Sequence, residues 1–183
     1  IPSRLVGSEM CIRDRGIPVM TGASVEVSDA ASGEVEVRWS PPTDADTVEA
    51  FPGPYRYAVE ARPDAGAEWT VIYEGLTGAV LGELDTGHVH TGIDSEGPTW
   101  RYRVTAWSGG DAIGLSTPAP VPDLQLGPED NSMVLSVPAG RPWFDTAYVF
   151  HRIAPDGTPT LLDTVALPQF TDCLLYTSPS PRD

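Results

Sequence analysis

The stretch Glu34-Val-Glu-Val-Arg-Trp-Ser40 decides the fold class, because apolar and polar side chains alternate along it without a break. Val35, Val37 and Trp39 fall on one side of such a segment, and the charged residues fall on the other. A period of two is that of a β-strand with one buried face. β-Branched and aromatic residues favour the same structure. We therefore expect a strand here, with Val35, Val37 and Trp39 in a core.

Similar short segments recur on both sides of this strand. They place apolar or aromatic side chains at every second position, over 23–28 (Val25, Val27), 54–60 (Tyr55, Tyr57, Val59), 69–74 (Val71, Tyr73) and 100–106 (Trp100, Tyr102, Val104, Ala106). Ala31-Ser-Gly33 and Ser108-Gly-Gly-Asp111 can close turns between them. The closest candidate for a helix is 75–84, but its glycines disfavour one. The sequence predicts an all-β fold, with a spacing typical of a β-sandwich.

The pattern starts again after Pro118-Ala-Pro-Val-Pro122. Proline cannot donate to a strand ladder, so this segment is expected to be an edge strand or a stiff connector. The second set of apolar positions is Leu124, Leu126, Met133, Leu135, Val137, Tyr148, Phe150, Leu161 and Leu162. We therefore expect a first β-sandwich over 16–122 and a second, truncated one over 123–172.

The two ends of the chain share an unusual relation. Residues 173–183 can be encoded by a DNA sequence whose reverse complement translates as Leu5-Val-Gly-Ser-Glu-Met-Cys-Ile-Arg-Asp14. This DNA resembles a transposase adapter used to prepare sequencing libraries. We expect 1–15 and 173–183 to be translated adapter, and 16–172 to be a native fragment open at both ends. Cys11 and Cys173 then carry no information on disulfides.

The composition limits the classes of partner. Residues 16–172 contain 23 acidic and 7 basic side chains, a net charge of −16, and the whole chain has no lysine. This argues against nucleic acid, whose binding needs a basic footprint. No stretch approaches the roughly 18 apolar residues of a membrane span. A soluble, loop-rich protein is expected, and a chain this acidic contains neighbouring carboxylates by chance.

Three segments together resemble a fibronectin type III domain. They are Val37-Arg-Trp39-Ser-Pro-Pro42, Tyr57-Ala-Val-Glu60 and Tyr102-Arg-Val-Thr-Ala106. The resemblance implies a seven-stranded sandwich with Trp39 in its core. The family's corner tyrosine would fall at Trp100, whose indole N–H could donate the corresponding hydrogen bond.

A narrower resemblance covers most of 23–172. Val37-Arg-Trp-Ser-Pro-Pro-Thr-Asp44 with Phe51-Pro-Gly-Pro-Tyr-Arg-Tyr57 is similar to modules of large bacterial surface proteins linked to gliding motility and type IX secretion. The second unit, with Trp143, Tyr148-Val-Phe150 and Phe170-Thr-Asp172, is similar to the module that follows there. The resemblance implies export to the cell surface.

Candidate binding residues form three sets. His88 and His90 share one side of a strand or extended loop near Asp85, Asp94 and Glu96, a thin set for a metal, and an edge position without a ligand is the alternative. His151 is expected to point outward. Asp44, Asp46 and Glu49 resemble part of a calcium cage or form a solvated acidic loop. Trp69 and Trp107 could form a sugar-binding platform, whereas Trp39, Tyr57, Trp100 and Tyr102 are expected in the core.

No catalytic, cofactor-binding or metal residue is assigned, because no nucleophile elbow, phosphate-binding glycine loop or zinc-spaced set is present. We expect non-catalytic modules of a large exported protein, secreted or at the cell surface, that act as spacers or adhesion surfaces. Their partners would be neighbouring β-sandwich modules of the same chain, or surface proteins or glycans. Two alternatives remain: accessory modules of an extracellular hydrolase, or a module with its own ligand at His88 and His90 or an exposed tryptophan.

Overall fold

The computed structural model describes residues 17–43, 51–122, 125–129, 132–137, 148–154, 156, 158–167 and 169–172. Within them the regular elements are β-strands, apart from one 3-10 turn, η2 (Leu81–Glu83), inside the weak helix candidate 75–84. The prediction of an all-β chain is confirmed. No helix in the described residues has the length and apolarity to cross a membrane. The described residues fall into two compact units, and the first runs to Val121 and the second begins at Pro122.

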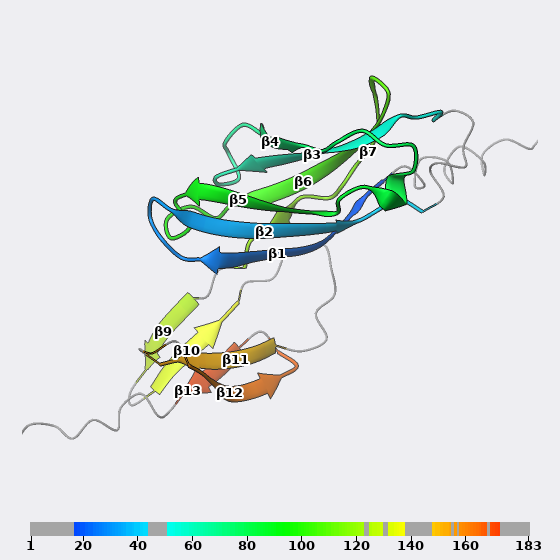
Figure 1. Cartoon of the computed structure of the whole chain (residues 1–183). Coiled ribbons are helices and arrows are strands. Elements are labelled where there is room, and N and C mark those ends of the chain that lie inside the picture. The colour runs from blue at the N-terminus through cyan, green and yellow to red at the C-terminus, as the bar shows by residue number, and fades with distance from the viewer. Residues whose placement is uncertain are drawn as a thin grey trace, which may run out of the picture. The chain divides into compact units, whose positions relative to one another are not determined.

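The first unit is a sandwich of two antiparallel sheets (Figure 1). The smaller sheet has the order β1-β2-β5, with β1 (Val19–Val27), β2 (Gly33–Ser40) and β5 (Gly87–Ile93). The larger sheet has the order β4-β3-β6-β7, with β4 (Thr70–Glu74), β3 (Tyr55–Arg62), β6 (Arg101–Ser108) and β7 (Asp111–Leu115). The short β8 (Ala119–Pro120) pairs with the first two residues of β6 and continues the edge that β7 forms. With β7 and β8 taken as one interrupted strand, this is the seven-stranded, fibronectin type III-like sandwich that the resemblance implied.

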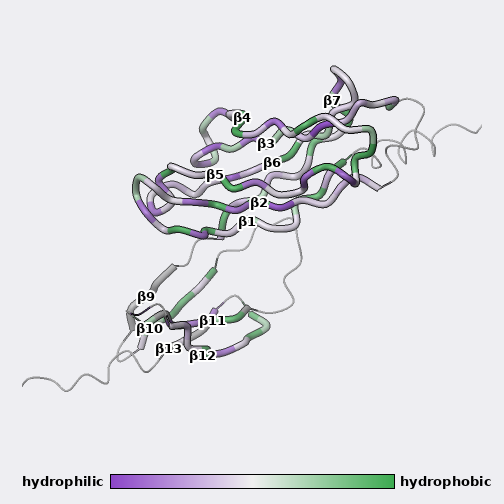
Figure 2. Tube along the Cα trace, viewed as in Figure 1, coloured by the Kyte–Doolittle hydropathy of each residue, from purple (hydrophilic) through white to green (hydrophobic). Residues whose placement is uncertain are grey.

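The core lies between the two sheets and comes mainly from β2, β3 and β6. Its fully buried members include the residues expected from alternation, and Figure 2 shows apolar and polar segments alternating along these strands. The core residues are Met20, Ala23, Val35, Val37, Trp39, Tyr55, Tyr57, Val59, Ala61, Leu81, Ile93, Tyr102, Val104, Ala106, Ala119 and Val121. Trp100 packs against this cluster but is only partly buried.

Two expectations from alternation are wrong. Val25 and Val27 are exposed, and β1 instead buries Met20 and Ala23. The register of β1 against β2 shifts between Met20 and Gly22, so the buried positions lie three residues apart and the simple alternation is broken. In β4, Val71 is 51% exposed because the register against β3 shifts beside it, and Val71 pairs with the outward-facing Glu60.

The turn after β1 is tied to the segment that follows β5. The Asp29 carboxylate accepts hydrogen bonds from the amides of Ala31 and Ser32, each at 2.7 Å, which closes the predicted hairpin. Ser95 Oγ donates to the carbonyl of Val27 at 3.0 Å. Gly33 allows this close approach, because a Cβ there would lie 2.6 Å from Ser95 Cβ. The two connections therefore fix the same end of the sandwich.

The second unit contains five described strands in two sheets. β9 (Gln125–Glu129), β10 (Ser132–Ser136) and β13 (Gln169–Asp172) form a sheet of order β13-β10-β9, and β11 (Tyr148–Ile153) pairs with β12 (Pro159–Val165). Phe150 is buried and His151 is exposed, as expected. Leu161 is 58% exposed, so it is not the core residue that the sequence suggested. The predicted positions Leu124 and Trp143 lie outside the described residues, and the predicted domain limits stay predictions.

Candidate functional site

The outer surface of the larger sheet gathers arginine and tryptophan from three segments. β3 and β6 pair along their whole lengths, which sets Arg56 opposite Trp107, Glu60 opposite Arg103 and Arg62 opposite Arg101. Alternate residues of a strand point to the same side, so these side chains share the face that points away from the core. We call this surface, together with Trp69, the Arg–Trp face. Its members are Arg56, Glu60, Arg62, Trp69, Arg101, Arg103 and Trp107.

Cation–π contacts and two ion pairs order much of the Arg–Trp face, and the weaker ion pair joins Arg56 Nη1 to Glu74 at 3.3 Å. The Arg56 guanidinium lies 4.5 Å from the ring centroid of Trp107, and those of Arg62 and Arg103 lie 4.5 and 4.3 Å from that of Trp69. Arg103 also donates from Nε and Nη2 to the two carboxylate oxygens of Glu60, at 2.8 and 2.9 Å. This bidentate geometry is the strong form of an arginine–carboxylate pair. Its two side chains are 23% and 17% exposed, so solvent screens them only in part.

Arg62 and Arg101 differ from their neighbours because neither forms an ion pair within the described residues. They lie directly opposite each other on adjacent strands. The Nε–H of each is buried and has no hydrogen-bond partner in the part of the chain that the structure describes. Arg62 makes one long hydrogen bond, from Nη1 to the carbonyl of Ala67 at 3.5 Å. Like charges in this position repel each other, and no carboxylate in the described part of the chain pairs with either arginine to offset this repulsion.

The two tryptophans of the suggested sugar platform do lie on the outer side of the sheet. Each ring has a guanidinium against it, and both side chains are partly buried. The surface is therefore a mixed array of rings and cations, and a bare aromatic platform is absent from it. This composition resembles that of protein interfaces, in which arginine and tryptophan are enriched.

The outer surface of the smaller sheet has the opposite charge. Glu34 and Glu36 alternate with the buried valines of β2, and Ser24, which faces Glu36 across the pair, donates to Glu26 at 2.6 Å. Arg38 pairs with Glu36 at 2.9 Å and has a raised pKa, first because of its hydrogen bond with Glu36. We call Glu26, Glu34 and Glu36 the acidic face. It is separated from the Arg–Trp face by the thickness of the sandwich.

His88 and His90 lie on the inner side of β5, at the edge of its sheet. The His88 ring stacks on Tyr73 with centroids 4.5 Å apart, and His90 Nδ1 lies 3.1 Å from the Tyr102 hydroxyl. Burial lowers the pKa of both imidazoles, and the neighbouring His88 lowers that of His90 further. Burial also raises the pKa of the Tyr102 hydroxyl. Burial therefore favours the neutral form of both histidines, and both rings pack against aromatic rings.

Two of the three carboxylates near the histidines form hydrogen bonds elsewhere. Asp94 accepts hydrogen bonds from the amides of Glu96 and Gly97, at 3.0 and 2.9 Å. Glu96 accepts a long bond from Ser28. No group of three potential ligands that could hold a metal is found among the residues described. Asp44, Asp46 and Glu49, the suggested calcium ligands, lie outside the described residues.

Trp100 fulfils the role expected of the corner residue. Its Nε1–H donates to the carbonyl of Asp94, six residues upstream, at 2.7 Å. A tyrosine corner makes the same kind of bond from its hydroxyl to the backbone upstream. The indole therefore fixes the connection between β5 and β6, as the sequence suggested.

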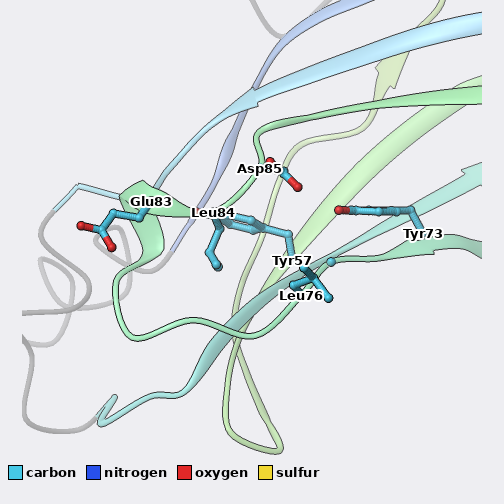
Figure 3. Close-up of a pocket in the computed structure, with 7 residues that line it drawn as sticks. Tyr57, Tyr73, Leu76, Glu83, Leu84 and Asp85 are labelled. Atoms are coloured by element: carbon cyan, nitrogen blue, oxygen red, sulfur yellow. The ribbon is translucent and has the colours of Figure 1, made fainter.

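A small pocket opens beside β3 and β4, with a volume of about 220 Å³ (Figure 3). Tyr57, Tyr73, Leu76, Leu84 and Asp85 are among the residues that line it. In Figure 3 the Tyr73 hydroxyl and the Asp85 carboxylate are directed toward the same space, whereas the carboxylate of Glu83 points away. The volume lies below the roughly 300 Å³ at which sites for small molecules begin. The sequence pointed to Asp85, but not to its position beside Tyr73.

Comparison with known proteins gave matches among solved structures alone. No model of a protein family and no curated protein matches the chain. An Fn3-like protein from Clostridium thermocellum is 22% identical, with a TM-score of 0.38, over 59% of this chain and 92% of that one. Chicken CNTN1 FN1–FN3 domains are 14% identical, with a TM-score of 0.35, over 86% of this chain and 55% of that one. Titin kinase with its flanking domains is 14% identical, with a TM-score of 0.33, over 64% of this chain and 26% of that one.

Proposed function

We propose that this chain contains two non-catalytic, fibronectin type III-like modules of a large exported cell-surface protein of the gliding-motility type, and that the first module is a mechanical spacer. The main support is the path of the chain through the first unit. Val19 at the start of β1 pairs with Ser40 at the end of β2, at one end of the sandwich. Val121 donates its amide to the carbonyl of Trp100, at the opposite end.

This path determines how a pulling force would act. The strand that enters, β1, runs antiparallel to β2, and the edge formed by β7 and β8 runs antiparallel to β6. Antiparallel hydrogen bonds lie perpendicular to the strands. Tension along the chain therefore shears many hydrogen bonds at once, and the core resists without a disulfide. A module under this kind of load transmits force while it keeps its folded length.

Single-molecule force spectroscopy tests the spacer role. The full chain, pulled from its two termini, is expected to show one sharp unfolding event for the first unit. Extension at about 3.4 Å per residue between Val19 and Val121 adds on the order of 300 Å of contour length. The control is a Cys11→Ser, Cys173→Ser, Ser32→Cys, Val121→Cys variant. It is pulled from residues 32 and 121, at the same end of the sandwich, where strands peel apart at a lower force. Equal forces in the two geometries, or no resolvable event, would overturn the proposal.

The accessory role in an extracellular hydrolase is the second candidate, and the outward position of Trp69 and Trp107 supports it. The uncut genomic reading frame on both sides of residues 16–172 separates the two. A catalytic domain in that frame supports the accessory role, whereas an array of repeats ending in a sorting domain supports the surface spacer.

A further inference from the structure

The two outer faces of the first unit are complementary in charge. We propose that the Arg–Trp face of one copy of this chain docks on the acidic face of a second copy, with Arg62 and Arg101 contacting Glu34 and Glu36. This assigns a self-association surface to a sheet face that the spacer role does not use.

The distribution of charge is the first argument. Four of the seven arginines between residues 16 and 172 lie on the Arg–Trp face, in a segment with 23 acidic side chains. A chain with so few cations would be expected to disperse them among its carboxylates. It instead places two of them, Arg62 and Arg101, side by side without an ion pair within the described residues. The carboxylate that would balance this pair is best supplied by another molecule.

The character of the surface is the second argument. Trp69 and Trp107 lie among the guanidinium groups, and the apolar side chains of Val71 and Leu115 are 51% and 45% exposed at the flanks. Both pair with outward-facing residues of the neighbouring strands, Glu60 and Thr105. Arginine and tryptophan are the residues most enriched at the energetic centres of interfaces. The bidentate pair of Arg103 with Glu60 holds the centre of this face in one arrangement before docking.

The acidic face has matching features. Glu34 and Glu36 lie two residues apart on the central strand of the smaller sheet, so their carboxylates are spaced along one line. Val89 on the adjacent β5, opposite Glu36, is 42% exposed and gives this face an apolar contact. Arg38 neutralises part of the charge of Glu36, which leaves Glu34 as the strongest anchor.

The net charge of −15 sets the conditions for association. Like net charges repel at long range, but at about 0.15 M salt the Debye length is near 8 Å, so contacts between opposite faces dominate. At about 1 M salt the length falls to near 3 Å and the attraction is screened as well. Because the two faces are different surfaces, the contact is heterologous and does not close at a dimer. The mean mass should therefore keep rising with protein concentration.

Sedimentation velocity of the full chain, in reducing buffer because of Cys11 and Cys173, tests the proposal. The wild type is expected to associate at 0.15 M salt and to be monomeric at 1 M. Arg62→Glu/Arg101→Glu and Glu34→Arg/Glu36→Arg should each lower the association constant at least about tenfold, since each creates like-charged faces. An equimolar mixture of the two variants should associate again, because their faces are complementary.

Glu83→Arg/Asp85→Arg is the matched control, because it changes the same number of charges outside both faces and should leave association unchanged. A wild type that remains monomeric at every concentration overturns the proposal, as does a mixture that fails to associate. Titration with polyglucuronate and heparin tests whether the Arg–Trp face binds a polyanionic glycan and not a second copy of the chain. If Arg62→Glu/Arg101→Glu abolishes glycan binding while the wild type stays monomeric, the face binds a polyanionic glycan instead. None of these outcomes bears on the unfolding force of the first unit.

Discussion

The inner and outer sides of β3 and β6 share one backbone but are stabilised by different interactions. On the inner side, Tyr57, Val59, Tyr102 and Val104 are almost completely buried between the sheets. On the outer side, arginine, glutamate and tryptophan cover the same backbone through cation–π contacts and two ion pairs. The inner side is held by the removal of apolar surface from water, whereas the outer side is held by directional contacts. The comparison indicates that stability resides mainly on the inner side, whereas the outer side presents the charges on which the proposed self-association depends.

The largest expected effect comes from the inner side. Tyr102→Ala should lower the free energy of unfolding of the first unit by about 3–5 kcal/mol, because it removes a fully buried ring. Arg101→Ala, its outward-facing neighbour, should change it by no more than about 0.5 kcal/mol. Urea denaturation followed by tryptophan fluorescence measures both. Similar losses for the two variants would contradict the assignment of stability to the inner side.

An intermediate effect is expected at the one strong ion pair of the outer side. Arg103→Ala should cost about 1–3 kcal/mol, because it leaves the partly buried carboxylate of Glu60 with only the long hydrogen bond from Thr105. A double-mutant cycle with Glu60→Gln isolates the coupling between the two side chains. The exposed pair of Arg38 with Glu36 is the control, and Arg38→Ala should change stability by less than about 1 kcal/mol. If the two substitutions lowered the free energy of unfolding equally, the Arg103–Glu60 pair would contribute no more to stability than an ordinary exposed ion pair.

The smallest effect concerns the pH dependence of stability. Burial lowers the pKa of His88 and His90 in the folded state, so the unfolded chain binds more protons than the folded chain at acidic pH. Their contribution to stability is therefore complete above the ordinary histidine pKa of 6.5 and is lost as the pH falls below it. His90→Gln should flatten the decline of the unfolding free energy below pH 6.5. His151→Gln, at an exposed position of the second unit, should not. A steeper or unchanged slope in His90→Gln would show that burial does not lower the pKa of this imidazole.

The sequence predicted the parts of the fold that depend on local pattern. Alternation identified β2, β3 and β6 with their buried residues but did not predict β7, and the corner position of Trp100 came from the resemblance to the fibronectin type III family. Alternation failed at Val25 and Val71, where register shifts beside β1 and β4 move the buried positions. A bulge leaves no clear mark in a short sequence segment, because it depends on the partner strand.

The candidate surfaces could not be predicted from local sequence pattern, because they depend on how distant strands pair. Trp69 and Trp107 were singled out for their outward position, but no pattern along the chain connects Arg62 with Arg101, which are 39 positions apart in the printed sequence. Only the pairing of β3 with β6 brings them together. The histidines were expected at an edge, and their contacts with Tyr73 and Tyr102 appear only when the two sheets are stacked.

Residue order alone therefore determined that this chain forms β-strands and which side of most strands is buried, because hydrophobic alternation is a property of neighbouring residues. The tertiary structure decided which charges share a surface, which arginines have no ion pair with another described residue, and what the indole of Trp100 binds. Those features depend on cross-strand register and on the contact between sheets, and both are set by residues far apart in the chain.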